Sequence, residues 1–242
     1  MSTSNSLLTL SKVHTHIGQY HILQGIDLTA PAGQLTVILG RNGAGKTTTM
    51  RSIMGLEHAS AGTIMFDGRD ITQARTETIA RLGISYVPEN MGIFGGLTVR
   101  ENMVIAARHG SMNATRLDWI LERFPPLKRF WNMSAGNLSG GQKQMLSIAR
   151  AVIEPRALLL IDEPSKGLAP AIVQTLIDTL LAIKQETTIV LIEQNFSMAS
   201  QVADTVVVVE DGRTAHAGSM AEFIQRTDLQ QRLLGLSLDA AA

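Results

Sequence analysis

The sequence of 242 residues contains no cysteine, so disulfide bonds and thiolate metal sites are excluded. Aromatic residues make up only 4% of the chain, which argues against the base-stacking platforms of single-stranded nucleic-acid binders. The formal net charge is zero, with 21 basic and 21 acidic side chains, and it provides no electrostatic footprint for a polyanion. We therefore expect no nucleic-acid partner.

Long hydrophobic runs are also missing. No stretch approaches the roughly 20 apolar residues that cross a bilayer, and the longest runs, 157–161 and 206–209, have the length of buried strands. Residues 1–6 combine neither a basic nor a long apolar region, so we expect no secretory signal. These absences predict a cytoplasmic protein. If it serves transport, the pore must be another polypeptide.

A glycine-rich segment follows an apolar run that reads as a buried strand, Leu35 to Leu39. Residues 40–47 match G-x-x-x-x-G-K-[ST], the pattern of a phosphate-binding loop whose backbone N–H groups point into one concavity. In that pattern Lys46 reaches the β- and γ-phosphates, and the Thr47 hydroxyl coordinates Mg²⁺. The alternative is a chance glycine-rich turn. The predicted phosphate-binding residues are Gly40, Arg41, Asn42, Gly43, Ala44, Gly45, Lys46, Thr47 and Thr48.

A second apolar run, Ala157 to Ile161, ends in two carboxylates and a proline. Pro164 cannot donate to a β-ladder, so it ends the strand. At the tip of a central strand, Asp162 suits Mg²⁺ and Glu163 suits the role of general base toward water. The other interpretation is a common exposed Asp-Glu pair. Taken with the phosphate loop, the pair predicts ATP and Mg²⁺ as the ligands of this protein.

A third motif, Leu138-Ser139-Gly140-Gly141-Gln142, lies between the other two. A Ser-Gly-Gly sequence that opens a helix is itself an anion site, because it offers free N–H groups and the positive end of the helix dipole. The plain alternative is a helix cap. One chain would then carry two phosphate-binding elements.

This ordered set resembles the ATP-binding subunits of ABC transporters, over about Leu7 to Leu234, and residues 138–142 equal their signature letter for letter. The likeness is closer to an ATPase of importers of branched-chain and other polar amino acids, on Val-Pro-Glu at 87–89, Leu-Ala-Pro at 168–170 and Ile-Glu-Gln-Asn at 192–195. The resemblance implies that two such domains face head to tail, with the signature of each (Leu138, Ser139, Gly140, Gly141 and Gln142) closing in trans on the other's γ-phosphate.

Three positions depart from the superfamily's commonest pattern. Glu89 stands where most members have glutamine; it could still reach Mg²⁺ or the water, but it adds a charge. Gln194 replaces a histidine that contacts the γ-phosphate, and it cannot carry a proton at neutral pH. Ala169 stands where aspartate is usual, which puts a contact across the dimer in doubt. All three look like features of the amino-acid importers, so we expect activity.

The resemblance also assigns candidate roles. Its catalytic residues are Glu163, Gln194 and Glu89, and its Mg²⁺ ligands are Thr47, Asp162 and Glu89. The aromatic residue that usually stacks on adenine aligns with Ile17, and His16 or Tyr20 could substitute for it.

The strand-like segments alternate with helical stretches, which is typical of a mainly parallel sheet covered on both faces. Early strands lie closer together, with Asp67-Gly68 as a tight turn, and predict a small antiparallel sheet. We expect strands at 7–13, 35–39, 63–66, 84–87, 157–161, 188–192 and 205–209, and helices at 46–54 and 141–153.

Residues from about 90 change to methionine-rich helical segments interrupted by Pro125-Pro126, with Thr98 and Glu101 forming a capping box. The expected fold class is α/β: a P-loop NTPase core, a small N-terminal antiparallel β subdomain and a helical insertion that carries the signature. We expect one domain over 1–242, with a RecA-like core at about 1–89 and 155–242 and a helical subdomain at about 90–154. Met103, Met112, Met133 and Met145 read as core filling or as an adaptable docking surface.

The sequence thus predicts an ATPase subunit that powers an ABC importer of amino acids, bound at the cytoplasmic face of the membrane. Expected partners are a second, non-identical ATPase, transmembrane permease subunits and, indirectly, an extracytoplasmic solute-binding protein. The permease would dock near Glu89 and on exposed apolar side chains of residues 94–103. The alternatives are an ABC-type motor of a lipid or polysaccharide export complex, a non-transport ABC ATPase, and a module that binds ATP without hydrolysing it.

Overall fold

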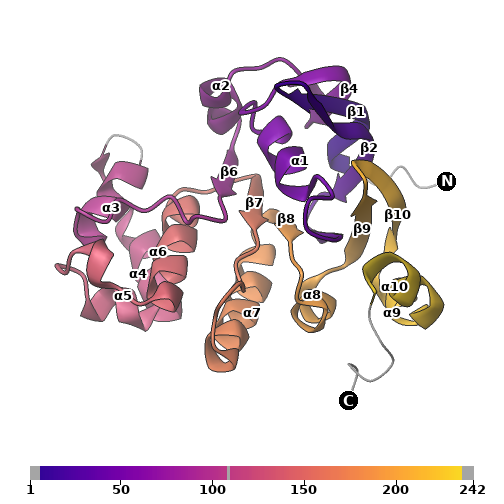
Figure 1. Ribbon diagram of the computed structural model, residues 1–242. Coiled ribbons are helices and arrows are strands. Elements are labelled where there is room, and N and C mark those ends of the chain that lie inside the picture. The colour runs from indigo at the N-terminus through magenta and orange to yellow at the C-terminus, as the bar shows by residue number, and fades with distance from the viewer. Residues whose placement is uncertain (1–5, 108–109, 236–242) are drawn as a thin grey trace.

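The computed structural model describes residues 6–107 and 110–235, which form two sheets and the helices packed on them (Figure 1). The first five residues, part of the segment in which we expect no secretory signal, lie outside these ranges. The smaller sheet is antiparallel, as predicted, with the order β2-β1-β4-β5. Its strands are β1 (Ser6–Ile17), β2 (Tyr20–Pro31), β4 (Ala59–Phe66) and β5 (Arg69–Asp70).

Strand β2 is absent from the sequence prediction, and β1 is longer than predicted. Irregularities in the pairing of β1 with β2 explain both differences, because each register shift breaks the period-2 alternation that marks a strand. Gly25 lies inside β2 at φ +111°, a backbone conformation that side-chain-bearing residues rarely adopt.

The larger sheet has the order β10-β9-β3-β8-β7-β6. Five neighbouring strands run parallel to one another: β6, β7, β8, β3 and β9. Strand β10 pairs antiparallel with β9 at the edge of the sheet. Every residue of β3, β7 and β8 is buried, so these strands read as continuous apolar runs. The strands are β3 (Leu35–Leu39), β6 (Ile84–Val87), β7 (Leu158–Asp162), β8 (Thr188–Ile192), β9 (Thr205–Glu210) and β10 (Arg213–Ser219).

The two faces of the larger sheet are covered differently. Val37 and Leu39 of β3 belong to a core shared with α7 (Pro170–Lys184) and α8 (Phe196–Val202). Ile38 points into a second core, shared with α1 (Lys46–Ile53) and the antiparallel sheet. The remaining helices outside the insertion are α2 (Thr76–Arg81), α9 (Met220–Ile224) and α10 (Thr227–Leu234). This layering holds the carboxyl ends of the parallel strands at one edge.

The helical insertion follows β6 and occupies the left of Figure 1. Its elements are α3 (Val99–Ala106), α4 (Ala114–Arg123), α5 (Pro125–Arg129), a 3₁₀ turn (Ala135–Asn137) and α6 (Gly140–Val152). The Thr98 capping box is confirmed, since Thr98 Oγ1 accepts from Glu101 N at 3.1 Å and Thr98 N donates to Glu101 Oε2 at 2.8 Å. The two sheets and the helical insertion agree with the expected α/β fold class. The predicted boundaries of the core and of the helical subdomain stay a prediction.

The methionines and apolar residues of the insertion divide between core and surface. Met103 and Val99 are fully buried, so the expectation that residues 94–103 are exposed as a block is wrong. The physical reason is that α3 packs against α6 and turns one face inward. Phe94 remains 48% exposed, and Met133 is 38% exposed rather than core filling. Met145 is buried, and Met112 packs partly buried against the same core.

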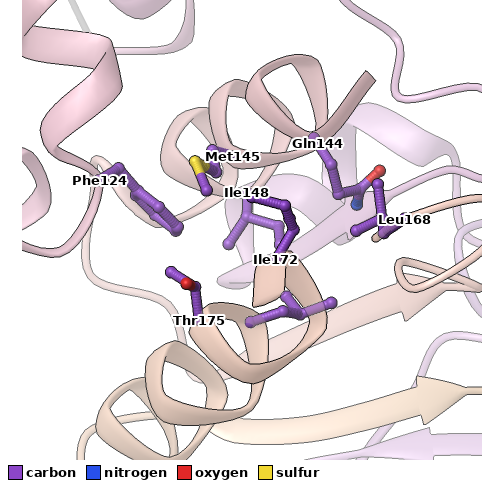
Figure 2. A pocket seen from close by; sticks show the side chains of 9 residues that line it. Phe124, Gln144, Met145, Ile148, Leu168, Ile172 and Thr175 are labelled. Carbon is purple, nitrogen blue, oxygen red and sulfur yellow. The ribbon is translucent and has the colours of Figure 1, made fainter. Parts of the chain in front are cut away.

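Helix α6 packs directly on α7. Figure 2 shows Met145 and Ile148 of α6 facing Ile172 and Thr175 of α7 across a pocket of about 10 Å³, which is at the lower limit for one water molecule. A Cβ atom at Gly141 would lie 3.0 Å from Ile172 Cγ2, so glycine permits the close approach. Side chains of α6 and α7 are therefore in direct contact along this pocket.

Candidate active site

The phosphate loop joins β3 to α1 and depends on two glycines for space. At Gly40, φ is +150° and a Cβ atom would lie 2.2 Å from the carbonyl oxygen of Val209. At Gly45, φ is +105° and a Cβ atom would lie 2.8 Å from Leu23 Cδ2. The carbonyl oxygen of Val209 is part of the backbone of β9 and cannot move without disturbing that strand, so no side chain fits at position 40. The loop predicted from the sequence is thus held between β9 and β2.

Lys46 lies over this loop at the start of α1. Its buried side chain places Nζ 2.9 Å from the Gly40 carbonyl oxygen and 3.0 Å from the Arg41 carbonyl oxygen, and donates to both. The pocket beside it has a volume of about 340 Å³, within the range of ligand-binding clefts. Its lining residues are Ile22, Asn42, Gly43, Gly45, Lys46, Thr47, Thr48, Glu89, Glu163 and Lys166.

Asp162 ends β7 with a fully buried side chain. Its Oδ2 accepts a hydrogen bond of 3.3 Å from the Tyr86 hydroxyl, while its Oδ1 has no hydrogen-bond partner among the described residues. Burial raises the pKa of Asp162, the Thr47 hydroxyl beside it lowers that pKa, and the neighbouring Glu163 carboxylate raises it. A buried acceptor without a partner costs free energy, and a cation would satisfy it.

These residues fit Mg²⁺. The ion is usually bound by one or two carboxylates together with water and substrate phosphates, and not by an all-protein cage. Asp162 and Thr47 provide such a partial set, and Glu89 lines the same pocket. Within the described ranges no group of three or more His, Cys, Asp or Glu side chains is placed to hold a metal ion.

Glu163 follows Asp162 with φ +48°, in the left-handed region. Such a conformation costs a non-glycine residue roughly 1–3 kcal/mol and persists where the surroundings hold it. The backbone N–H of Glu163 donates to Ile192 O at 3.0 Å. Its carboxylate is 9% exposed, with Oε1 3.7 Å from Lys46 Nζ. The strained residue therefore directs a carboxylate toward the phosphate loop.

The structure brings Gln194 to the same carboxylate. Gln194 Nε2 donates to Glu163 Oε1 at 2.5 Å and to Asn42 Oδ1 at 2.7 Å. Asn42 of the loop, Glu163 and Gln194 thus form one hydrogen-bonded group, although Gln194 lies 152 positions from Asn42 and 31 positions from Glu163 in the chain. Its arrangement can orient a water molecule and accept a proton from it.

Lys166 is a residue of this site that the sequence reasoning missed. Its Nζ donates to Glu89 Oε1 at 2.6 Å and lies 3.6 Å from Glu163 Oε2. The hydrogen bond and charge of Glu89 raise the pKa of Lys166. The charge that Glu89 adds is therefore compensated inside the pocket. The only sequence signal is a lysine three positions after Glu163, where a loop was expected.

The three adenine candidates lie on the hairpin of β1 and β2. Ile17 and Tyr20 pair across it and are both exposed. His16 has other contacts, because its ring stacks on His21 with centroids 4.1 Å apart and its Nδ1 lies 3.1 Å from Ser60 Oγ. Ile22, which the sequence reasoning did not select, lines the pocket. The choice of an adenine contact stays a prediction.

The signature motif lies apart from the pocket. Ser139 caps α6, with its Oγ accepting from Gln142 N at 3.4 Å and its N donating to Gln142 Oε1 at 2.9 Å. Figure 1 places α6 and α1 on opposite sides of β6 and β7, and none of residues 138–142 lines the pocket beside Lys46. A Cβ atom at Gly140 would meet nothing within 4 Å. The start of α6 at Gly140 therefore has free space around it, and its role as an anion site stays a prediction.

A phosphate loop, a buried carboxylate for a cation and a strained glutamate at the tips of parallel strands define a P-loop nucleoside triphosphatase. The chain belongs to the ABC transporter family, whose model matches residues 23–166, and it is an ATPase subunit. Among the described residues, no helix is long and apolar enough to cross a membrane.

Similar proteins match most of the chain, between 88% and 95% of it. The high-affinity branched-chain amino acid transport ATP-binding protein BraG of Pseudomonas aeruginosa is 34% identical over 95% of this chain and 100% of its own. The probable branched-chain amino acid transport ATP-binding protein LivF of Archaeoglobus fulgidus is 32% identical over 95% and 99%. The Nod factor export ATP-binding protein I of Burkholderia lata is 31% identical over 88% and 71%.

Solved structures show the same fold. The ADP conformation of MJ1267, an ATP-binding cassette of an ABC transporter, superposes with a TM-score of 0.82 at 24% identity, covering 95% of this chain and 97% of that one. The predicted family and fold are confirmed.

Proposed function

We propose that this chain is the ATPase of an importer for branched-chain amino acids or a similar small polar solute. The observation that carries this proposal is the similarity to BraG and LivF along essentially the full length of all three proteins. The Nod factor export relative is matched over a smaller share of both chains, and it makes export the second candidate. Glu89, Ala169 and Gln194 also follow the importer pattern expected from the sequence.

In the proposed reaction, the N–H groups of residues 40–48 and the Lys46 ammonium hold the β- and γ-phosphates of ATP. Asp162 and Thr47 hold Mg²⁺, with Glu89 within reach of the same pocket. When bound, Mg²⁺ neutralises charge on the phosphate oxygens. Lys46 already has its Nζ fixed by two loop carbonyls, so little reorganisation is needed on binding.

Glu163 acts as the general base in this proposal. It accepts a proton from the water whose oxygen attacks the γ-phosphorus, while the bond to the β-γ bridging oxygen breaks and ADP leaves. Gln194 cannot exchange a proton, so its role is to orient: its Nε2 donates to Glu163 Oε1 and to Asn42 Oδ1. Glu89, held by Lys166, lines the same pocket and assists the water or the cation in this proposal.

A second ATPase subunit of the same fold completes the site in this proposal. The signature of the chain lies away from its own pocket and has free space around Gly140, which supports a role in trans, head to tail. The permease would be a separate polypeptide that docks on the helical insertion at the cytoplasmic face of the membrane. Phe94, Ile105 and Met133 are exposed apolar side chains of this region, and Glu89 lies at the start of it. An extracytoplasmic solute-binding protein would act through the permease.

The test is to isolate the complex from native membranes through a tag on this chain, identify the co-purifying proteins, and measure uptake of labelled leucine. We expect a permease and a second ATPase, and uptake that is lost in Phe94→Asp together with Ile105→Asp. The matched control is Leu56→Asp, an exposed apolar residue outside the insertion. Co-purification with a lipid or polysaccharide exporter would support the second candidate, and co-purification without any membrane protein would contradict transport.

A further inference from the structure

Glu193 is a buried carboxylate to which the reaction described above assigns no task. It follows Ile192 at the end of β8, directly before Gln194, and its side chain is only 2% exposed. Buried carboxylates are rare unless they are paired or hydrogen-bonded. No lysine, arginine or histidine forms an ion pair with Glu193 within the part of the chain that the structure describes.

Four donors converge on this carboxylate in place of a cation. Oε1 accepts from the backbone N–H of Ser165 at 3.0 Å. Oε2 accepts from Ser165 Oγ at 2.8 Å, from Gln194 N at 3.1 Å and from Asn195 N at 3.2 Å. Burial raises the pKa of Glu193 by more than the hydrogen bonds from Ser165, Asn195 and Gln194 lower it, so the net shift is upward. Only a carboxylate presents two acceptor oxygens without a donor, so the site suits an ionised glutamate.

The donors belong to the two segments that carry the proposed base and its orienting amide. Ser165 lies two positions after Glu163, whose backbone is strained at φ +48°. Gln194 is the residue next to Glu193, and its side chain donates to Glu163 Oε1. The carboxylate of Glu193 therefore links the segment after β7, which carries Glu163, to the segment after β8, which carries Gln194.

We propose that Glu193 is a positioning residue for ATP hydrolysis: it fixes the segment after β7 against the segment after β8, and so holds Glu163 and Gln194 in register. This inference rests on the proposed roles of Glu163 and Gln194. A purely structural carboxylate would stabilise the fold, and its loss would not lower turnover selectively. A positioning carboxylate affects turnover while nucleotide binding, which depends on Lys46 and the phosphate loop, is retained.

The experiment compares Glu193→Gln with wild type in the full-length chain, by ATPase kinetics, binding of a fluorescent ATP analogue and thermal unfolding. Glutamine has nearly the same shape but turns an NH₂ group toward N–H donors. We expect kcat to fall at least thirty-fold while the dissociation constant of the analogue changes less than three-fold. Glu193→Asp, which keeps both acceptor oxygens on a shorter side chain, should recover part of kcat.

The matched control is Asp204→Asn, since Asp204 Oδ2 also accepts a backbone N–H, from Leu35 at 2.8 Å, but lies away from the pocket. Its kcat should equal that of wild type. Ser165→Ala removes one of the four donors and leaves the three backbone N–H donors in place, so it tests the proposal if Glu193→Gln does not fold. Its kcat should fall several-fold at unchanged affinity. In a folded Glu193→Gln protein, adding Ser165→Ala should lower kcat little further.

Normal kcat in folded Glu193→Gln, or in Ser165→Ala where Glu193→Gln does not fold, would overturn the proposal, and so would equal losses of kcat and nucleotide affinity. Glu163→Gln run beside them separates this failure from failure of the proposed function. If Glu163→Gln is inactive and Glu193→Gln is normal, only the positioning role is wrong. If Glu163→Gln hydrolyses ATP normally, the assignment of the base is wrong as well.

Discussion

Replacing Glu163 by glutamine tests the chemistry at its centre. The change keeps the length and shape of the side chain and leaves an acceptor oxygen for Gln194 Nε2, which donates to Glu163 Oε1 at 2.5 Å. It removes the basic oxygen pair and the charge that lies 3.7 Å from Lys46 Nζ and 3.6 Å from Lys166 Nζ. The geometry of the pocket is therefore preserved while its proton acceptor is lost.

The expected size of the effect follows from the role. A positioned general base contributes about 10²- to 10⁴-fold in rate, or roughly 3–5 kcal/mol of activation free energy. Nucleotide affinity should stay the same or rise, because one negative charge beside the phosphates is removed while Lys46 keeps its contacts to Gly40 and Arg41. Glutamine must adopt the same left-handed backbone at φ +48°, so little stability should change.

The assay measures steady-state phosphate release, ATP affinity and the dimer fraction in the presence of ATP. Glu163→Gln should release phosphate at least a hundred-fold more slowly and accumulate an ATP-bound dimer. Glu57→Gln removes the same charge outside the pocket, from a surface ion pair with Arg51 at 2.9 Å, and should behave as wild type. Phosphate release by Glu163→Gln at the wild-type rate would refute the base assignment and leave Glu163 a structural residue.

Three further predictions address the other parts of the site. Lys46→Ala should weaken ATP binding by roughly ten- to a hundred-fold, since hydrogen bonds to charged groups contribute about 1.5–3 kcal/mol; unaltered affinity in equilibrium titration would contradict the phosphate-loop assignment. Gly140→Asp should leave ATP binding by the monomer nearly unchanged, because a Cβ atom there has free space, but should abolish dimer formation and hydrolysis in sedimentation and ATPase assays; a normal rate would remove the role in trans. In a double-mutant cycle of Glu89→Gln and Lys166→Met, the coupling in unfolding free energy should be below about 1 kcal/mol and decrease with salt, because the side chains are 47% and 62% exposed; a larger, salt-independent coupling would show that the pair is desolvated.

The sequence is most informative where the chemistry and the fold demand the same residues. Gly40 and Lys46 follow a fully buried strand, and Asp162 ends another, so both motifs could be placed at strand tips from pattern alone. Parallel strands bring their carboxyl ends to one edge, and this accounts for the meeting of Asn42, Glu163 and Gln194.

The features that sequence reasoning missed depend on contacts between distant segments. In the sequence Lys166 is an ordinary lysine, and only the structure shows that it pairs with Glu89. Glu193 is one letter of a motif, and only the structure shows that four donors from two segments bond to its carboxylate. Residues 94–103 were expected to supply exposed apolar contacts, although Met103 also read as core filling, because the hydrophobic pattern of α3 does not say which neighbour covers it. The position of β10 is equally hidden, since its sequence, Arg-Thr-Ala-His-Ala-Gly-Ser, contains no large apolar side chain.

The order of strands around β3 has a consequence for the synthesis of the protein. The neighbours of β3 are β8 and β9, and the phosphate loop is closed from the far end of the chain, with Gly40 beside Val209 and the Ala44 oxygen accepting from Gly212 N at 2.9 Å. About 170 residues separate β3 from β9, which corresponds to roughly 10–30 s of translation at about 5–20 residues per second. Throughout that interval the ribosome-bound chain carries the complete glycine-rich motif without β9, which closes the loop at Gly40. We therefore expect nucleotide binding to be one of the last properties that a nascent chain acquires.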